Sequence, residues 1–360
     1  MQSAWGSDTL VERPSIFHPL GDGWHVDRGR FDERLAAWAS SVGASVRANV
    51  GRCRVERMDS GFQVSPARAE AVVARFLFDA SGRGAPGSAP LRQRAWLAWD
   101  RQVALVARVA ASSRDVGNHL LLEAAEEGWW YSVPQADGAL VVVLITDADL
   151  VPAGGQGTLE ARFRAALSRT GYTAERAHDL AFTAGLRVVR SDSGWLLPDR
   201  GLGWRAIGDA AMATDPLAGD GVARAITSAL DAVGSLETQA DGGEIATAFS
   251  RYLDARARYH ASEARWPDAP FWARRRPIVD WKEAPVMLSP EATVVWGHAP
   301  PPHAEALLPP RALRELRAVL ASPRPAHLAL SRLRDIVPVG DRRLLVGLQA
   351  LVVMGSLKMS

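Results

Sequence analysis

One segment of the sequence, residues 204–233, combines residue types that suit the binding of a cofactor. A short apolar strand is expected to end at Gly208-Asp209-Ala210-Ala211, and the chain then runs through Asp215-Pro216-Leu217 and Gly219-Asp220-Gly221 into a helix. A glycine turn at a helix start presents free backbone N–H groups at the positive end of the helix dipole, which suits an anion or an electron-rich ring. An acidic residue directly after a strand can accept hydrogen bonds from sugar-like hydroxyls. The segment therefore predicts one side of a cofactor site.

Two further stretches could contribute to a site. The apolar run 72–78 is typical of a buried strand, and it ends in the polar loop Asp79-Ala80-Ser81-Gly82-Arg83. The stretch Gly128–Pro134 contains Trp129 and Tyr131 at alternate positions, which would place both side chains on one face of a strand. That face could be an ordinary sheet surface or a wall for an aromatic ligand, and the sequence leaves both readings open.

Together these motifs resemble the FAD-dependent monooxygenases and the related flavin-dependent halogenases, which share the p-hydroxybenzoate hydroxylase-type fold. The resemblance implies that Asp209 binds the ribityl chain of FAD and that the loop Pro216–Val222 lies against the pyrimidine edge of the flavin. It also implies a reductant, either NADPH or a separate flavin reductase. The residues that it assigns to the cofactor are Asp79, Gly82, Arg83, Gly208, Asp209, Pro216, Gly219, Gly221 and Val222.

The resemblance also suggests a substrate side, formed by Trp129, Tyr131, Pro134 and His25. Halogenases carry a Trp-x-Trp-x-Ile-Pro signature in this region, and the chain departs from it at Tyr131 and Val133. The residues Arg265–Arg275 resemble a stretch in flavoproteins that hydroxylate a tryptophan of a partner protein. We therefore expect a monooxygenase that hydroxylates an indole or a phenol, or a tryptophan of a peptide or protein. The alternatives are a halogenase, a prenyl reductase or a truncated, non-catalytic remnant, and no catalytic residue is assigned.

A defining part of the family is absent from the sequence. Members begin with a strand, a Gly-x-Gly-x-x-Gly turn and a helix, which together bind the pyrophosphate and the adenosine half of FAD. Residues 1–360 contain no such pattern. We therefore expect the missing fold to be lost through a mis-assigned start, or to be supplied by a partner chain.

Hydrophobic periodicity indicates the elements that position these motifs. Asp27 is expected to cap a helix that reaches Val42, and Asp137-Gly138 is expected to form the turn of a β-hairpin. The predicted class is α/β of the mixed α+β kind, with three parts. These are an incomplete FAD-binding Rossmann-like domain (1–90 and 183–260), an antiparallel-sheet substrate domain (91–182) and a helical C-terminal region (261–360). The expected strands are 44–50, 52–58, 62–65, 72–78, 103–109, 119–122, 129–133, 140–146, 186–190 and 195–198, and further helices are expected at 158–168, 307–320 and 328–336.

Composition excludes several other classes of protein. The 42 basic and 40 acidic residues nearly balance, and the arginines are scattered, so no nucleic-acid partner is expected. Cys53 is the only cysteine, which rules out an internal disulfide and a multi-cysteine metal site. The N-terminal residues carry no signal-like apolar segment, and the longest apolar run is too short to span a bilayer. We expect a cytoplasmic protein with no metal and no membrane anchor.

Overall fold

The structure, a computed structural model, divides the chain into two compact units. Unit 1 comprises Met1–Arg54, Val64–Val72 and Val103–Arg190, and unit 2 comprises Val55–Gln63, Val73–Gln102 and Ser191–Ser360. Both units contain helices and strands, which confirms the mixed α/β class. The division into three domains stays a prediction. The residues that the structure describes are 1–12, 23–83, 91, 96–110, 117–151, 154–177, 181–196, 198–235, 243–276, 284, 286–337 and 339–359.

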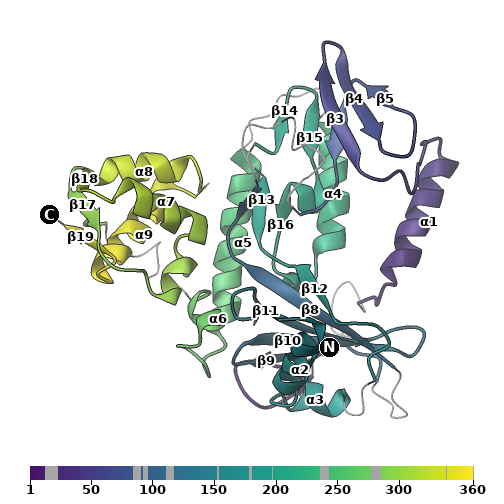
Figure 1. The fold of residues 1–360 in the computed structure, drawn as a ribbon, viewed down its shortest axis with the longest axis horizontal. Coiled ribbons are helices and arrows are strands. Elements are labelled where there is room, and N and C mark those ends of the chain that lie inside the picture. The colour runs from purple at the N-terminus through teal and green to yellow at the C-terminus, as the bar shows by residue number, and fades with distance from the viewer. Residues whose placement is uncertain are drawn as a thin grey trace. The chain divides into compact units, whose positions relative to one another are not determined.

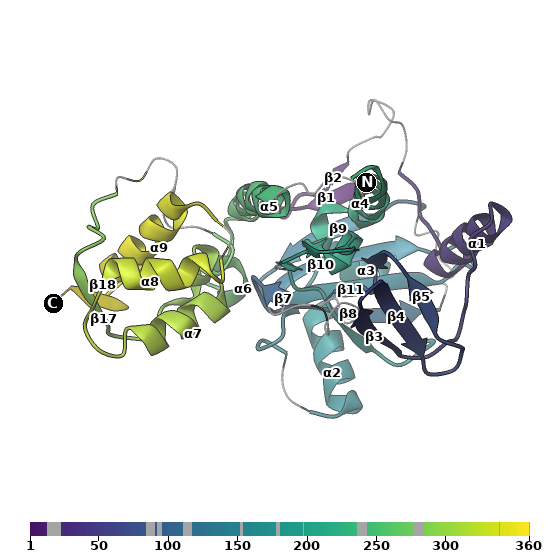
Figure 2. The same cartoon turned by 90° about the horizontal axis from the view of Figure 1, so that it is seen from above.

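The main element of unit 1 is a seven-stranded sheet (Figures 1 and 2). Its central strands are rich in apolar residues, and β11, with the sequence LVVVLITD, is buried along nearly its whole length. The hairpin turn at Asp137-Gly138 is confirmed, because Gly138 has φ +82° and the Asp137 carboxylate accepts the Ala139 N–H at 3.1 Å. In spatial order the strands are β12 (Arg187–Arg190), β8 (Gln102–Val109), β11 (Leu140–Asp147), β10 (Gly128–Pro134), β9 (Leu121–Ala125), β1 (Gln2–Ala4) and β2 (Val11–Glu12).

Helix α2 (Gln156–Leu167) covers one face of this sheet, as Figure 2 shows. Phe163 of the helix is buried and packs edge-on against Trp130 of β10, with ring centroids 5.0 Å apart. Such a pair of large aromatic rings stabilises the contact beyond the burial of area alone. Unit 1 also contains α3 (Tyr172–Arg176) and α1 (Arg28–Ser41). The Asp27 cap of α1 is confirmed, because its carboxylate accepts the Arg30 N–H at 3.2 Å.

Unit 2 contains two small sheets that precede its helices. The first has the order β14 (Arg200–Gly201), β15 (Trp204–Ala206) and β6 (Leu77–Asp79), and the second has the order β16 (Met212–Ala213), β13 (Gly194–Leu196) and β7 (Trp96–Ala98). Helices α4 (Gly221–Gly234) and α5 (Gly243–Ala261) follow, and the short 3₁₀ turns η3 (Gly208–Ala210) and η4 (Pro216–Ala218) lie between the strands and α4.

The C-terminal part of unit 2 has its own dense core. Leucines and alanines from its helices pack together with Trp99, Trp195 and Phe249, and all of these side chains are buried. The elements are α6 (Pro270–Ala273), η5 (Pro302–Ala306), α7 (Pro310–Val319), α8 (Ala326–Arg334), α9 (Asp341–Val353) and a sheet ordered β18 (Arg324–Pro325), β17 (Thr293–Trp296) and β19 (Leu357–Met359). Within the described residues, no helix is both long enough and apolar enough to cross a membrane.

Three expectations about secondary structure are wrong. Residues 44–50 form no strand, because the left-handed residues Gly43 and Asn49 interrupt extended backbone at both ends. The run 72–78 forms two strands, because β5 (Val72–Ala74) joins β4 (Gly61–Pro66) and β3 (Cys53–Met58), whereas β6 joins β15. The C-terminal region is not purely helical, since it includes the sheet formed by β17 to β19.

Candidate cofactor site

The candidate site is built on the parallel pair β6 and β15. Leu77 pairs with Trp204, Phe78 with Arg205 and Asp79 with Ala206, so the two strands end at the same level. The carboxyl ends of neighbouring parallel strands place their loops side by side, which is where open α/β sheets bind ligands. The two polar loops that the sequence singled out therefore lie next to each other.

Asp79 shapes the first loop. It is 3% exposed, its carboxylate accepts the Ser81 N–H at 2.9 Å, and it also accepts a hydrogen bond from the Ser81 hydroxyl. Its backbone oxygen accepts the Ile207 N–H at 2.9 Å, which extends the pairing of β6 with the second loop. Gly82 follows with φ +82°, a conformation that favours glycine. Asp79 thus folds the turn that presents Arg83.

Asp209 lies between two arginines. Its carboxylate oxygens are 3.6 Å from Arg83 Nε and 3.5 Å from Arg224 Nη2, and 39% of its side chain is exposed. Arg224 also pairs with Asp220 at 3.2 Å, one helical turn earlier on α4. The arginines hold the Asp209 carboxylate in place while part of it faces solvent. Sequence reasoning missed Arg224, although its i, i+4 spacing from Asp220 was a usable signal.

Gly208 sits where no larger residue fits without strain. It has φ +55°, and an added Cβ would lie 3.2 Å from the Cβ of Ala225 on α4. Its N–H donates to the Ser228 hydroxyl at 2.7 Å, so the helix also satisfies the turn's backbone. The glycine therefore lets the turn that carries Asp209 approach α4 closely.

The loop before α4 leaves open space around its glycines. Gly219 has φ +65°, and a Cβ added at Gly219, Gly221 or Gly82 would meet no atom within 4 Å. The N-terminus of α4 has no side-chain cap, so its first N–H groups have no side-chain acceptor. Val222 in that first turn is 39% exposed. The loop thus presents small residues and backbone donors toward space that the described chain does not fill.

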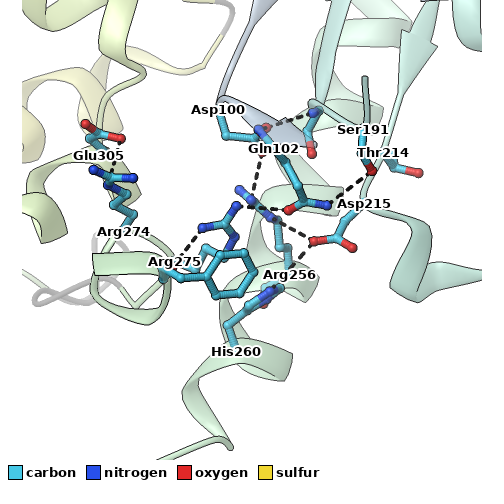
Figure 3. Close-up of polar contacts among 12 residues, drawn as sticks. Asp100, Gln102, Ser191, Thr214, Asp215, Arg256, His260, Arg274, Arg275 and Glu305 are labelled. Carbon is cyan, nitrogen blue, oxygen red and sulfur yellow. Dashed lines mark hydrogen bonds and ion pairs between the residues drawn. The ribbon is translucent and has the colours of Figure 1, made fainter. Parts of the chain in front are cut away.

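A polar network of buried side chains adjoins the start of this loop at Asp215, and Figure 3 shows several of its members. Asp215, which opens the loop, is 3% exposed, and its Oδ1 accepts the Leu217 N–H at 3.0 Å. Its Oδ2 lies 3.7 Å from Arg256 Nε and 3.7 Å from His260 Nε2, both on α5. Its N–H donates to the Tyr252 hydroxyl at 2.9 Å. Sequence reasoning missed all three α5 residues, and their i, i+4, i+8 spacing was the only available signal.

The charges in this network balance when His260 is neutral. Arg256 pairs with Asp100 at 2.7 Å as well as with Asp215, and Arg275 donates to Gln102 Oε1 at 2.9 Å. Burial, which is the largest cause, and the nearby cations Arg256 and Arg275 lower the pKa of His260 to about 3, against the opposing effect of Asp215. His260 is therefore a neutral hydrogen-bonding group at neutral pH, not the cation of an ion pair.

The proposed substrate residues lie in unit 1. Trp129 and Tyr131 share one face of β10, with ring centroids 5.8 Å apart, and Trp5 packs edge-on against Trp129 at 6.4 Å. Trp129 is buried, whereas Tyr131 and Pro134 are partly exposed, and burial raises the pKa of Tyr131. The structure thus forms an aromatic strip at this part of the sheet.

His25 is associated with a different group of residues. Partial burial, and next the positive charge of Arg176, lower the pKa of His25. Arg176 donates to the Ser132 hydroxyl at 3.2 Å, and Ser132 alternates with Tyr131 along β10. Arg176 therefore lies on the face of the sheet opposite to Tyr131. The assignment of His25 to the substrate pocket stays a prediction that no described contact supports.

Comparisons with known proteins agree on the type of fold. The chain is 29% identical over 293 residues, 76% of each chain, to LodB of Marinomonas mediterranea, which is described as an FAD-dependent oxidoreductase. It superposes on the flavin-dependent halogenase CmlS with a TM-score of 0.64 and 18% identity, covering 99% of this chain and 83% of that one. It also superposes on QhpG, a peptidyl tryptophan dihydroxylase essential for tryptophylquinone cofactor biogenesis, with a TM-score of 0.61 and 22% identity over 98% and 83% of the chains. No family model matches the sequence.

Fold and site together are those of an FAD-dependent oxidoreductase. The chain is similar in sequence to LodB, and it shares its fold with a flavin-dependent halogenase and a peptidyl tryptophan dihydroxylase. At the level of sequence, the similarity to LodB extends over three quarters of both proteins.

Proposed function

We propose that this protein is an FAD-dependent monooxygenase that hydroxylates an electron-rich aromatic ring. The observation that carries the proposal is the convergence of Arg83, Asp209 and the glycine loop before α4 at one edge of the parallel pair. This arrangement combines a part-exposed carboxylate with unfilled space beside backbone donors.

The residues present suit the flavin half of FAD. Asp209 would accept hydrogen bonds from the ribityl hydroxyls, because its carboxylate is held by two arginines and still partly exposed. The amides at the start of α4, beside Gly219 and Gly221, would stabilise negative charge on the flavin ring. Bound flavin, once reduced, would activate molecular oxygen for transfer to the substrate. The chain itself would bind and orient that cofactor and would exclude water from around it.

The aromatic strip of unit 1 supports an indole or phenol as the substrate. Trp5, Trp129 and Tyr131 offer ring faces and edges suited to stacking against another aromatic ring. Burial raises the pKa of Tyr131, so its hydroxyl stays protonated and can donate a hydrogen bond at neutral pH. The likeness to QhpG makes a tryptophan of a peptide or protein a suitable candidate within this class. The departures at Tyr131 and Val133 make hydroxylation the better proposal than halogenation.

We also propose that another segment or chain holds the adenosine half of the cofactor. Parallel strands are ordinarily covered on both faces and flanked by further strands, yet β6 is an edge strand among the described residues. The apolar side of α4 is open as well, with Ile226 47%, Leu230 69% and Val233 60% exposed. An added strand and helix would cover these surfaces and supply the pyrophosphate site.

Flavin titration tests both parts of the proposal. The purified chain is titrated with FAD, FMN and ADP while the flavin absorbance bands are followed. Stoichiometric perturbation by both FAD and FMN, with no competition from ADP, is expected if this chain binds the flavin half alone. If neither flavin perturbs its bands, and an upstream-extended chain behaves the same way, the cofactor assignment is wrong.

A turnover assay then tests the reaction. The flavin-loaded protein receives a reductant, oxygen and either indole, phenol or a tryptophan-containing peptide, with and without chloride or bromide. A product that gains one oxygen atom supports hydroxylation. A halogenated product would instead establish the alternative, and flavin binding without either product would favour a remnant that binds but does not react.

A further inference from the structure

Helix α5 presents three polar side chains to the back of the candidate flavin loop. Tyr252, Arg256 and His260 follow each other at intervals of four residues, so they lie on one face of the helix. Arg256 is 7% exposed and His260 is fully buried, although arginine and histidine are seldom buried without partners. Polar groups at such positions need a structural or functional reason, because their desolvation is costly.

All three side chains approach one residue, Asp215. Tyr252 accepts the Asp215 N–H at 2.9 Å, while Arg256 and His260 each lie 3.7 Å from Asp215 Oδ2. The other carboxylate oxygen of Asp215 caps η4 through Leu217. Both the backbone and the side chain of Asp215 are therefore held, and the loop toward Gly221 starts from a fixed point.

The three α5 side chains are themselves tied to the rest of unit 2. The Tyr252 hydroxyl hydrogen-bonds the Ser193 hydroxyl at 2.7 Å, and the Ser193 N–H donates to Asp100 at 3.0 Å. Arg256 pairs with the same Asp100 at 2.7 Å, and His260 Nδ1 bonds the Arg256 carbonyl oxygen at 2.9 Å. A carbonyl oxygen only accepts, so the His260 proton sits on Nδ1. The contacts thus form a closed ring from Asp215 through Tyr252, Ser193, Asp100 and Arg256 back to Asp215, and Figure 3 shows the part from Asp100 through Arg256 to Asp215.

The loop is anchored from its opposite side too. Arg83 donates to the backbone oxygen of Thr214 at 3.0 Å and pairs with Asp209 at 3.6 Å. The residue before Asp215 is thus linked to the proposed ribityl-binding carboxylate. A displacement of Asp215 would therefore shift both the Asp209 carboxylate and the backbone amides that precede α4.

We propose that Tyr252 and Arg256 are positioning residues for the flavin loop, while His260 packs beside them and bonds the Arg256 carbonyl oxygen through Nδ1. Tyr252 and Arg256 hold Asp215, and through it the backbone donors between Leu217 and Val222, in the geometry that binds the flavin ring. The inference rests on the proposed flavin site, but the anchoring itself can be measured without flavin. None of the three residues is proposed to touch the cofactor or the substrate.

The test uses Tyr252→Phe, with Tyr259→Phe as the matched control. Both changes remove one hydroxyl from α5, but Tyr259 is 63% exposed and lies outside the network. Tyr252→Phe leaves the Asp215 N–H without its acceptor, and such a loss corresponds to about tenfold in an equilibrium constant. We expect amide hydrogen exchange in the segment 217–222 to become about tenfold faster. We also expect about tenfold weaker FMN and FAD binding with a shifted visible spectrum. Tyr259→Phe should change neither.

A second variant tests the cation of the network without removing its charge. Arg256→Lys keeps the cation but loses the guanidinium fork that spans Asp100 and Asp215, so it should fold and show an intermediate exchange rate. Unchanged exchange and an unchanged flavin spectrum in both Tyr252→Phe and Arg256→Lys would overturn the inference. Faster exchange with unaltered flavin binding would overturn it as well. If neither the wild-type chain nor the upstream-extended chain binds flavin while Tyr252→Phe still accelerates exchange, the anchoring stands and the proposed function fails.

Discussion

Arg83 Nε lies 3.6 Å from Asp209 Oδ2, although the two residues come from loops that are far apart in the sequence. The contact exists because β6 and β15 pair in parallel and end at the same level. It connects the two motifs that the sequence analysis identified separately. It also places a cation beside the carboxylate that we propose binds the ribityl chain.

Replacement of Asp209 should weaken flavin binding without unfolding the protein. Asp209→Asn removes the charge but keeps the shape, and a hydrogen bond to a charged group contributes about 1.5–3 kcal/mol. We expect FMN and FAD affinity to fall by about 10- to 100-fold in an absorbance titration. Asp231→Asn, an exposed position on the same region's helix α4, is the matched control. Equal affinities in the two variants would contradict the assignment of Asp209.

Gly208→Ala should destabilise the fold itself. The left-handed φ of +55° is unfavourable for alanine by about 1–2 kcal/mol, and the new Cβ would press on Ala225 at 3.2 Å. Thermal unfolding should therefore occur at a lower midpoint than in the wild type. Gly234→Ala provides the comparison, because a Cβ there meets nothing within 4 Å. A Gly208→Ala protein as stable as Gly234→Ala would mean that the turn can relax away from α4.

Gly221→Leu should separate binding from stability. Gly221 begins α4, and a Cβ added there meets no atom of the described chain within 4 Å. Leucine is also a better helix former than glycine by up to about 1 kcal/mol. We expect an unchanged or higher unfolding midpoint together with lost or altered flavin binding, measured by calorimetry and by absorbance. Full flavin binding by this variant would show that the open space is not where the ring lies.

Acid should destabilise the protein through His260. The folded-state pKa is lowered to about 3, below the ordinary value of 6.5, so the unfolded state binds the proton first as the pH falls. Above about pH 6.5, the contribution of His260 to the free energy of unfolding does not change with pH. Between about pH 6.5 and 3, the free energy of unfolding falls by up to about 1.4 kcal/mol per pH unit as the pH is lowered. Denaturant unfolding at several pH values measures this slope. His260→Gln should reduce it, whereas His327→Gln, a change at an exposed histidine of α8, should leave it as in the wild type.

Much of the local structure could be predicted because it depends on neighbouring residues. The Asp27 cap and the Asp137-Gly138 turn follow from short-range hydrogen bonds, and the strands β8, β10 and β11 follow from their runs of β-branched and aromatic residues. The run 72–78 could not be divided correctly from sequence. Its two halves pair with different sheets, and strand pairing is a long-range property that a local pattern does not contain.

In the candidate site, too, some features could be predicted from the sequence and others depend on the tertiary structure. The sequence alone determined which residues could do cofactor chemistry, because a glycine turn, an acid after a strand and a helix start act through local backbone geometry. Only the tertiary structure decided that Arg83 meets Asp209 and that Tyr252, Arg256 and His260 converge on Asp215. Those contacts depend on how separate strands and helices pack. The burial that lowers the pKa of His260 exists only after that packing is complete.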